Sequence, residues 1–513
     1  MFPGSHDPER PAVVMAGSGR ITTYGQLDAA ANRVAQLFSA QRLQPGDHIA
    51  LCVENSPVFF ELVWGAHYAG LLYTPCSTQL TPAELAYIAD DCGARTFFLS
   101  ARYAAGAQAI RARAPGVENW VSVGGEIDGF SSYEDAVAQM PPTPTGPDRI
   151  AGRDMLYSSG TTGRPKGIRP TMPAAPLADT PGIVTGILQG MFGQGPEDVY
   201  LSPAPLYHAA PLRFCMSFHQ IGATVLVMEH WDEARALELI ELHRVTTTQV
   251  VPTMFVRMLK LPASVRERAD VSSLRLVIHA AAPCPVEVKR QMLDWWGEII
   301  HEYYASTESV GLTWVTPEQW RRRPGTVGKP LVGVPHILSA DGRELGPGED
   351  GEVWFSDGPV FEYHNDPAKT EAVTNDRGWQ TFGDIGHLDE DGFLYLTDRA
   401  SYTIISGGVN VYPQEAEDAL QSHPAVMDAA VFGIPHADFG EAVHAVVQPV
   451  TMPADEAAAA ALEAELISSC RSTLASLKCP RTIDFRTELP RTPTGKLLKR
   501  LLKDEYAVAR TGT

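Results

Sequence analysis

The segment Tyr157–Gly167 has the composition of a phosphate-binding loop. It reads YSSGTTGRPKG and follows the apolar pair Met155-Leu156. Glycines allow backbone N–H groups to converge on an anion, hydroxyls add donors, and lysine supplies positive charge. No Gly-Lys-Ser/Thr follows at the spacing of the P-loop NTPases, so we predict a phosphate loop of another kind. The alternative is a flexible surface loop rich in glycine and serine.

Three further clusters carry groups that suit a nucleotide. Residues 302–308 (EYYASTE) place two tyrosines, which can stack on a base, before a Thr-Glu pair that can hold a phosphate oxygen and Mg²⁺. Asp384 and Arg399 offer a carboxylate and a guanidinium suited to a ribose diol. Residues 490–496 (PRTPTGK) form a turn-rich stretch that ends in a lysine. Taken singly, these clusters favour ordinary structural explanations: core tyrosines, a surface turn and a solvated basic helix.

Charge and missing motifs exclude several classes of function. The chain has 513 residues with 61 acidic and 41 basic side chains, a formal net charge of −20. Nucleic-acid phosphates and anionic lipids require clustered Lys and Arg, so we expect neither as a partner. The sequence has no HExxH and no GxSxG, which argues against zinc proteases and serine hydrolases. A GxGxxG match at 346–351 carries acids and precedes a strand-like segment, so it is not a dinucleotide fingerprint.

Cysteine usage and hydropathy indicate the compartment. Seven cysteines form no CxxC pair, and their odd number favours reduced thiols over a disulfide scaffold. The N-terminus lacks an apolar stretch long enough for a signal peptide, and no run of about 18 apolar residues occurs. We therefore expect a soluble, cytoplasmic protein with no integral membrane association.

The elements that must position these residues alternate along the chain. Apolar β-branched runs such as 48–53 and 246–251 are separated by helical patterns such as 56–68 and 232–243. This alternation predicts an α/β fold with largely parallel sheets and helices on their faces. After about residue 325, Asp-Gly pairs between short strand-like segments indicate hairpins. The residues after 399 are numerous enough to fold as a smaller unit.

In order and spacing, the motifs resemble those of the adenylate-forming superfamily, which includes acyl-CoA synthetases, amino-acid adenylation domains and beetle luciferases. The motifs are YSSGTTGRPKG at 157–167, YASTE at 304–308, GDIG at 383–386, DRASYTIISGGVNVYPQEAE at 398–417 and LPRTPTGK at 489–496. Weaker similarities extend the resemblance over nearly the whole chain. It implies a large N-terminal domain, residues 1–399, of parallel-type α/β sheets with a small β-barrel-like subdomain. A small, mobile α+β lid domain, residues 400–513, would follow.

The resemblance implies an AMP-forming ligase that uses ATP, Mg²⁺ and CoA. A carboxylate would attack the α-phosphorus of ATP, releasing pyrophosphate and leaving an acyl-adenylate. The CoA thiolate would then take the acyl group, with AMP as the leaving group. In such displacements a protein mainly positions the reactants and neutralises developing charge.

The resemblance also assigns residues to the nucleotide. Tyr304 would stack on the base, Asp384 and Arg399 would bind the ribose, and Glu308 would hold Mg²⁺. The full set of implied nucleotide-binding residues is Ser158, Ser159, Gly160, Thr161, Thr162, Gly163, Lys166, Ala281, Ala282, Pro283, Glu302, Tyr303, Tyr304, Thr307, Asp384 and Arg399.

Further residues are implied for catalysis and for the other substrates. Lys496 would bridge the acyl carboxylate and the α-phosphate, and would act as a catalytic residue with Glu308 and His208. The acyl site would be lined by His208, Ala305 and Ala281, and the CoA tunnel by Ser406, Gly407 and Gly408, with Ser401 at the hinge of the lid.

Three positions depart from the family pattern. Ala305 replaces the usual glycine after the stacking tyrosine, Phe382 replaces the usual threonine two residues before the ribose aspartate, and Ser401 replaces a charged hinge residue. Acetate-specific members carry Trp at the position of Ala305, so a methyl group there leaves the acyl channel open. With mainly apolar segments expected around the pocket, this favours a hydrophobic acid: fatty, aryl or alicyclic.

Other functions stay open from the sequence. The activated acid could pass to a carrier-protein thiol supplied by a second protein, or undergo luciferase-like oxidation. A nucleotide-binding regulator without catalysis is the alternative from a different class, and the presence of Lys496, Glu308, Asp384 and Arg399 together argues against it. The expected partners are a small carboxylic acid, ATP and CoA, and the resemblance also allows a homodimer.

Overall fold

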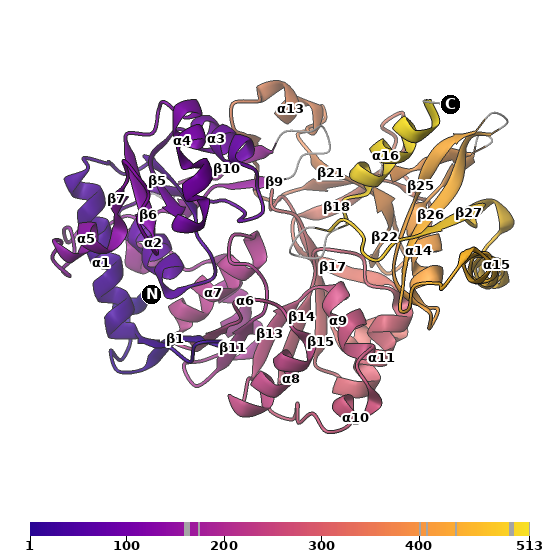
Figure 1. Cartoon of the computed structure of the whole chain (residues 1–513), viewed down its shortest axis with the longest axis horizontal. Coiled ribbons are helices and arrows are strands. Elements are labelled where there is room, and N and C mark those ends of the chain that lie inside the picture. Colours follow the sequence, from indigo (N-terminus) through magenta and orange to yellow (C-terminus); the bar gives the residue numbers. More distant parts are fainter. Residues whose placement is uncertain are drawn as a thin grey trace. The chain divides into compact units, whose positions relative to one another are not determined.

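The computed structural model describes residues 1–158, 165–172, 175–399, 402–406, 409–436, 439–491 and 497–511 (Figure 1). The chain forms two compact units. The first contains residues 1–249, 269–276 and 361–370, and the second contains 250–268, 277–360 and 371–513.

The first unit contains a six-stranded parallel sheet. Its order is β7-β6-β5-β3-β4-β8, and every described pairing in it is parallel. Strand β3 is buried at all its positions, as expected for a parallel sheet with covered faces. The strands are β3 (His48–Cys52), β4 (Leu72–Pro75), β5 (Ala94–Ser100), β6 (Asn119–Val123), β7 (Ser131–Ser132) and β8 (Arg153–Asp154). The helices of this region are α1 (Tyr24–Ala40), α2 (Pro57–Tyr68), α3 (Pro82–Asp91), α4 (Ala104–Arg113) and α5 (Tyr133–Ala138).

The same unit contains a second group of strands in the order β13-β11-β12-β1-β2. Strands β1, β11, β12 and β13 pair in parallel, and β2 runs antiparallel to β1. A small antiparallel sheet has the order β20-β10-β9. The strands are β1 (Pro11–Met15), β2 (Ile21–Thr23), β9 (Leu156–Ser158), β10 (Lys166–Arg169), β11 (Val199–Ser202), β12 (Thr224–Val227), β13 (Thr247–Val250) and β20 (Glu362–Tyr363). The helices are α6 (Ile183–Phe192), α7 (Ala209–Ile221) and α8 (Glu233–Leu242).

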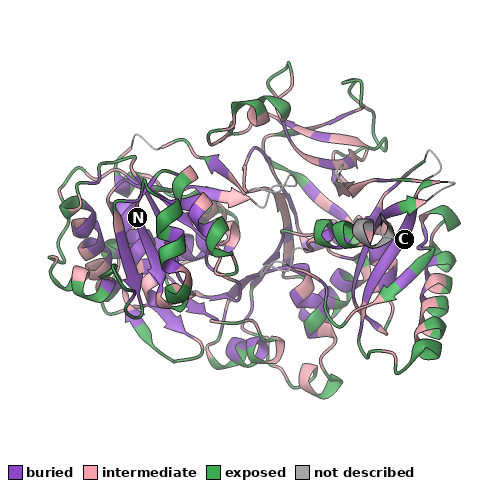
Figure 2. Cartoon of the chain, turned by 45° about the horizontal axis from the view of Figure 1, so that its top comes forward, coloured by how far each residue is buried: buried purple, intermediate pink, exposed green. Residues whose placement is uncertain are grey.

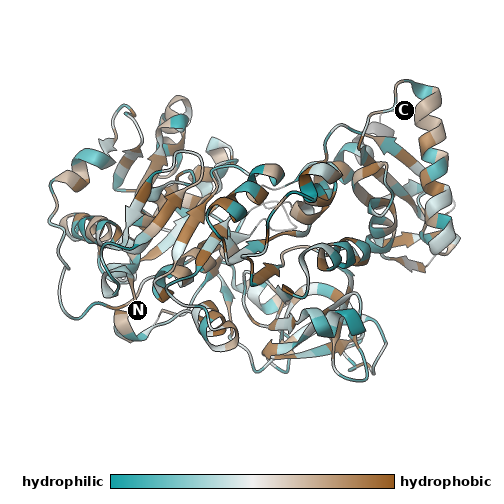
Figure 3. Cartoon of the chain, turned by 90° about the horizontal axis from the view of Figure 1, so that it is seen from below, coloured by the Kyte–Doolittle hydropathy of each residue, from teal (hydrophilic) through white to brown (hydrophobic). Residues whose placement is uncertain are grey.

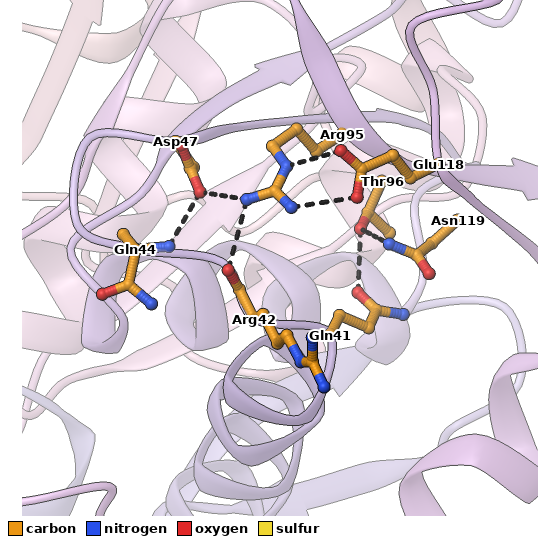
Figure 4. A network of polar contacts seen from close by, with 8 residues as sticks. All are labelled: Gln41, Arg42, Gln44, Asp47, Arg95, Thr96, Glu118 and Asn119. Carbon is orange, nitrogen blue, oxygen red and sulfur yellow. Dashed lines mark hydrogen bonds and ion pairs between the residues drawn. The ribbon is translucent and has the colours of Figure 1, made fainter.

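The Arg95 side chain of β5 links the connection between α1 and β3 to the parallel sheet by hydrogen bonds and ion pairs (Figure 4). Its guanidinium donates to both carboxylate oxygens of Glu118, at 3.0 and 2.9 Å, and to Asp47 Oδ2 at 2.6 Å. It also donates to the carbonyl oxygen of Arg42 at 3.2 Å. Arg42 has a φ of 61°. These side chains are partly exposed, and ion pairs between exposed side chains contribute about 0–1 kcal/mol each to stability. The network therefore fixes the shape of this turn more than it stabilises the unit.

The second unit contains the strand order β18-β19-β21-β22-β17-β16-β15-β14. Strands β14 and β15 pair in parallel, and the remaining described pairings are antiparallel. The strands are β14 (Leu276–His279), β15 (Ile300–Ala305), β16 (Leu312–Val315), β17 (Thr326–Val332), β18 (Val334–Leu338), β19 (Gly351–Ser356), β21 (Gln380–Leu388) and β22 (Leu394–Arg399). The helices beside them are α9 (Pro252–Leu259), α10 (Ala263–Arg266), α11 (Val286–Trp296) and α12 (Pro317–Arg322).

The predicted α/β class and hairpins are confirmed, but the barrel-like subdomain is an open run of strands. Strand β17 pairs with β22 on one side and with β16 on the other, so both of its edges are used. Among the described residues, β18 has no pairing with β17 that would close the run.

The C-terminal part of the second unit is an α+β fold, as predicted. Four strands follow the order β24-β23-β26-β25, and β27 pairs in parallel with β26. Figure 2 shows the two long strands β25 and β26 largely buried, whereas α15 buries only Leu466 and Cys470. Apolar residues likewise concentrate on these two strands in Figure 3. The elements are β23 (Ile404–Ser406), β24 (Val409–Val411), α14 (Pro413–Gln421), β25 (Val426–His436), β26 (Gly440–Pro449), α15 (Glu456–Thr473), β27 (Thr482–Phe485) and α16 (Lys499–Thr511).

Two further findings concern the whole described chain. Within the described ranges, no helix is both long enough and apolar enough to cross a bilayer. All seven cysteines have free thiols, as predicted.

The predicted domain boundary at 399/400 coincides with the end of β22, and residues 400 and 401 lie outside the described ranges. That boundary stays a prediction.

Candidate functional site

Two strands of the second unit bring Tyr304 and Asp384 together. Tyr304 lies near the end of β15 and Asp384 lies in β21, where it is 7% exposed. The Tyr304 hydroxyl donates to Asp384 Oδ2 at 2.6 Å. In β22, Arg399 is the backbone partner of Asp384 across the antiparallel ladder. The fold thus joins the side chains of Tyr304 and Asp384 and places Arg399 opposite Asp384 in the ladder, the three residues that the resemblance assigned to the base and the ribose.

Two phenylalanines surround the Tyr304 ring. The Phe382 ring meets it edge-on, with centroids 5.9 Å apart and planes at 76°, and the Phe355 ring lies at 6.3 Å. The two phenylalanine rings are 5.6 Å from each other. Phe382 is one of the three residues that depart from the family pattern, and the structure gives it a contact with the predicted base-stacking tyrosine.

The segment 281–283, implied by the resemblance to bind the nucleotide, begins two residues after the end of β14. Ala281 has a φ of 75°, a left-handed conformation that is rare for a residue with a Cβ, and Ser309 has a φ of 61°. Such strain costs about 1–3 kcal/mol per residue and concentrates at functional sites. Ala281 and Pro283 are exposed and Ala282 is half-buried, so this segment is accessible to a ligand.

Thr307 and Glu308 lie in the connection between β15 and β16, and both are half-buried. In the described ranges, no cluster of three or more His, Cys, Asp or Glu residues could hold a metal by itself. Mg²⁺ is usually bound by one or two carboxylates together with nucleotide phosphates and water. The Glu308 carboxylate fits that requirement.

Glu302 has a charged partner inside the protein. It is 6% exposed, and its Oε2 lies 2.5 Å from Nζ of Lys289 on α11, a side chain with no exposed surface. His279 Nε2 is 3.4 Å from the same oxygen, and the Lys289 ammonium lies 5.0 Å from the Trp320 ring centre. Burial raises the pKa of Glu302, and Lys289 opposes that shift. The predicted contact of Glu302 with the nucleotide stays a prediction.

The Tyr303 ring packs against a different aromatic residue from the Tyr304 ring. Its ring stacks on Trp314 of β16, with centroids 6.0 Å apart and planes at 11°. Ala305, the last residue of β15, is half-buried and pairs across the ladder with Leu312. The nucleotide contact of Tyr303 and the acyl contact of Ala305 stay predictions.

The predicted phosphate loop lies in the sequence between two paired strands of the first unit. Ser158 at the end of β9 is the ladder partner of Lys166 at the start of β10. Gly167 lies so close to its neighbours that a Cβ would be 2.7 Å from Met155 Cε. The predicted residues Ser159, Gly160, Thr161, Thr162 and Gly163 lie outside the described residues. The ladder nevertheless shows that Leu156–Ser158, directly before this segment, forms a strand.

His208 precedes α7 in the first unit and is neutral at pH 7. Burial lowers the pKa of His208 to about 4. Its Nε2 is buried and has no hydrogen-bond partner among the described residues, and its ring lies 4.6 Å from that of Tyr207. A neutral imidazole suits the lining of an apolar acyl site better than a charged one would.

The predicted residues of the lid are only partly described. Ser406 ends β23, where it pairs with Val409 and with Gly440. Ser401, Gly407, Gly408 and Lys496 lie outside the described residues. On the C-terminal side of Lys496, buried Lys499 forms an ion pair of 2.7 Å with Glu417 of α14.

Sequence reasoning missed Lys289 and Phe355. Lys289 lies beside the apolar residues Val288, Met292 and Leu293 of α11, all of them buried. A lysine within such a helical pattern was the available signal. Phe355 had no such signal in the sequence, because only the fold brings β19 near Tyr304.

Comparisons with known proteins add independent findings. The family model described as AMP-binding enzyme matches residues 4–362, and the model described as AMP-binding enzyme C-terminal domain matches residues 415–496. The fatty acid–[acyl-carrier-protein] ligase ScoC of Streptomyces coeruleorubidus is 32% identical, covering 98% of this chain and 95% of its own. The long-chain-fatty-acid–CoA ligase FadD13 of Mycobacterium tuberculosis is 31% identical, covering 98% and 96%. The crystal structure of ATP-bound MatB from Rhodopseudomonas palustris is 29% identical, with a TM-score of 0.82 over 98% and 96% of the two chains.

Proposed function

Because the chain belongs to the AMP-binding enzyme family, as its two matched domains and its relatives show, we propose that the residues placed above activate a hydrophobic carboxylic acid. The protein is an ATP-dependent acid–thiol ligase of the acyl-CoA synthetase type, with ATP and CoA as co-substrates. The observation that carries the proposed nucleotide site is the hydrogen bond between Tyr304 and Asp384 at 2.6 Å.

The proposed mechanism has two steps. A carboxylate oxygen attacks the α-phosphorus of ATP, the bond to the bridging oxygen of pyrophosphate breaks, and an acyl-adenylate forms. The CoA thiolate then attacks the acyl carbon, and the bond to the adenylate oxygen breaks to release AMP. Asp384 binds the ribose, Lys496 neutralises charge at the carboxylate and α-phosphate, and Glu308 would hold the Mg²⁺ that balances the phosphate charge.

Features of the described residues support a hydrophobic acid. The His208 imidazole is uncharged at pH 7, and Ala305 carries only a methyl group at the position that could block the acyl channel. Apolar walls reward each additional buried methylene of a substrate by about 0.8 kcal/mol.

The acid and the thiol acceptor are tested together. The full-length protein is incubated with ATP, Mg²⁺ and a panel from acetate to long-chain, aryl and alicyclic acids, with CoA or with a phosphopantetheinylated carrier protein. AMP and thioester are measured for each pair. We expect AMP and CoA thioester in equal amounts with hydrophobic acids. The resemblance to ScoC favours the carrier protein as the second candidate, and thioester formed only on that protein would replace CoA in the proposal.

Asp384→Ala tests the ribose site. The diol would lose a charge-assisted hydrogen-bond partner worth about 1.5–3 kcal/mol, so the Kd of ATP should rise by about 10- to 100-fold. Isothermal titration calorimetry with ATP and Mg²⁺ measures it. Asp350→Ala removes a carboxylate that hydrogen-bonds His387 and Thr397 in the same strands, and serves as the control. Unchanged ATP binding by Asp384→Ala would mean that the ribose lies elsewhere.

Ala305→Trp tests the acyl channel. The indole should fill the space beyond the carboxylate, so kcat/KM should fall for hydrophobic acids and change little for acetate. The wild type should act weakly on acetate, and the preference should therefore shift towards short acids in the variant. Ala305→Gly is the matched control and should keep the wild-type preference. If the wild type prefers acetate or propionate to every larger acid, another residue closes the channel.

Location and assembly complete the proposal. The seven free thiols and the acidic composition support a cytoplasmic protein. The family resemblance is the basis for a homodimer. Size-exclusion chromatography with light scattering tests the assembly.

A further inference from the structure

We infer that the Tyr304 hydroxyl is a positioning group for ribose recognition, holding the Asp384 carboxylate while two phenylalanines hold the tyrosine ring. The inference rests on the proposed function, in which Asp384 binds the ribose hydroxyls. Stacking on a base uses the face of a tyrosine ring and needs no hydroxyl, since phenylalanine has a similar face. Base stacking therefore does not explain why residue 304 carries a hydroxyl, and that group needs a role of its own.

The hydroxyl is bound to the group that must be oriented. It donates to Asp384 Oδ2 at 2.6 Å, and Asp384 is only 7% exposed. A hydrogen bond to a carboxylate is roughly twice as strong as one between neutral groups. A carboxylate has about four acceptor positions, and the bond from Tyr304 occupies one of them while limiting the rotation of the group.

The ring that carries the hydroxyl is itself held. Phe382 meets it edge-on at 5.9 Å, and Phe355 contacts both rings, at 6.3 Å from Tyr304 and 5.6 Å from Phe382. Edge-on and tilted contacts in this range are favourable arrangements for aromatic pairs. The position of Phe355 in turn needs a glycine at 311, where a Cβ would lie 2.2 Å from Phe355 Cδ1.

A short segment of β21 supplies both contacts to Tyr304. Phe382 touches the ring and Asp384 accepts from the hydroxyl, and Gly383 between them has a φ of 78°. A threonine at 382, which the family pattern would provide, has no ring to place against Tyr304. Phe382 therefore couples the base-stacking tyrosine and the ribose carboxylate of this chain into one rigid unit.

The test compares ATP with 2′-deoxy-ATP in the full-length enzyme. Tyr304→Phe removes one oxygen and keeps the ring. With saturating acid and CoA, the KM for ATP should rise about 3- to 10-fold, the loss expected for one hydrogen bond, and kcat should change little. The KM for 2′-deoxy-ATP should rise less, because one of the two ribose contacts is already missing. The preference for ATP over 2′-deoxy-ATP should thus fall by about threefold.

Two further variants separate positioning from a general loss of structure. Tyr24 is buried in the first unit, and its hydroxyl donates to the Ala223 carbonyl oxygen at 2.6 Å, so Tyr24→Phe makes the same chemical change at the same distance. It should lower stability and leave the preference for ATP unchanged. Phe382→Leu keeps an apolar side chain but removes the ring contact, and should lower the preference in the same direction as Tyr304→Phe.

The outcomes distinguish the inference from the function on which it rests. An unchanged preference in Tyr304→Phe, or an equal fall in Tyr24→Phe, would overturn the positioning role. If Asp384→Ala also binds ATP as tightly as the wild type, the proposed nucleotide site itself is wrong. A strong effect of Asp384→Ala without an effect of Tyr304→Phe would overturn the inference alone.

Discussion

Lys496→Ala is expected to lower the rate of adenylate formation by about 10²–10³-fold or more. A preorganised charge at the carboxylate and α-phosphate would be lost, and removing one such group typically has an effect of this size. Pyrophosphate release from ATP and the acid measures this step. In the second step the predicted lid rotation has moved Lys496 away from the reacting atoms. The variant should therefore still convert a supplied acyl-adenylate and CoA into thioester at nearly the wild-type rate.

The control for this variant is another lysine of the C-terminal region. Lys478 is partly exposed and pairs with Glu415 at 2.5 Å. Lys478→Ala should leave both steps close to the wild-type rate. An equal loss in both steps for Lys496→Ala would contradict the picture of a lid with two working positions.

Lys289→Met is expected to destabilise the protein by about 3–5 kcal/mol. Lys289 has no exposed surface, and its Nζ lies 2.5 Å from Glu302 Oε2. Removing the lysine leaves a buried carboxylate without its counter-charge, and breaking a buried pair in this way has a cost of that size. The midpoint of urea unfolding, followed by tryptophan fluorescence, should fall accordingly.

A double variant distinguishes the loss of charge balance from the loss of packing. Lys289→Met with Glu302→Gln removes both charges and should recover most of the lost stability, because replacing a whole buried pair is often neutral or stabilising. Arg322→Met is the surface control, since its pair with Glu318 is 70% and 74% exposed and should contribute no more than about 1 kcal/mol. A double variant as unstable as Lys289→Met would mean that packing, not charge, holds this cluster.

The sequence predicted those features that depend on local pattern. Alternating apolar runs predicted the parallel sheets, and Asp-Gly pairs predicted the hairpins after residue 325. The motifs also identified Tyr304 and Asp384, 80 residues apart, and the fold joins them by a hydrogen bond. The carboxylate and the aromatic ring were recognisable because the chemistry of a nucleotide requires these residue types.

Other features depend on long-range contacts that no local pattern encodes. The barrel-like subdomain was expected from the family resemblance, but whether strands close into a barrel depends on which strand edges are free, and β17 uses both of its edges. Glu302 was assigned from its place beside two tyrosines, whereas its partner Lys289 belongs to a helix with no chemical motif. The pairing of Phe355 with Tyr304 likewise depends on how β19 and β15 are placed by the sheet.

The most direct test of the proposed reaction traces the transfer of one carboxylate oxygen from the acid to AMP. The full-length enzyme is given ATP, Mg²⁺, CoA and a hydrophobic acid whose carboxylate carries ¹⁸O in both positions, and the products are analysed by mass spectrometry. Attack of the carboxylate on the α-phosphorus predicts one ¹⁸O atom in AMP for each thioester formed, and none in pyrophosphate. Label in inorganic phosphate, with ADP as the nucleotide product, would contradict the account, as would thioester formation with unlabelled AMP.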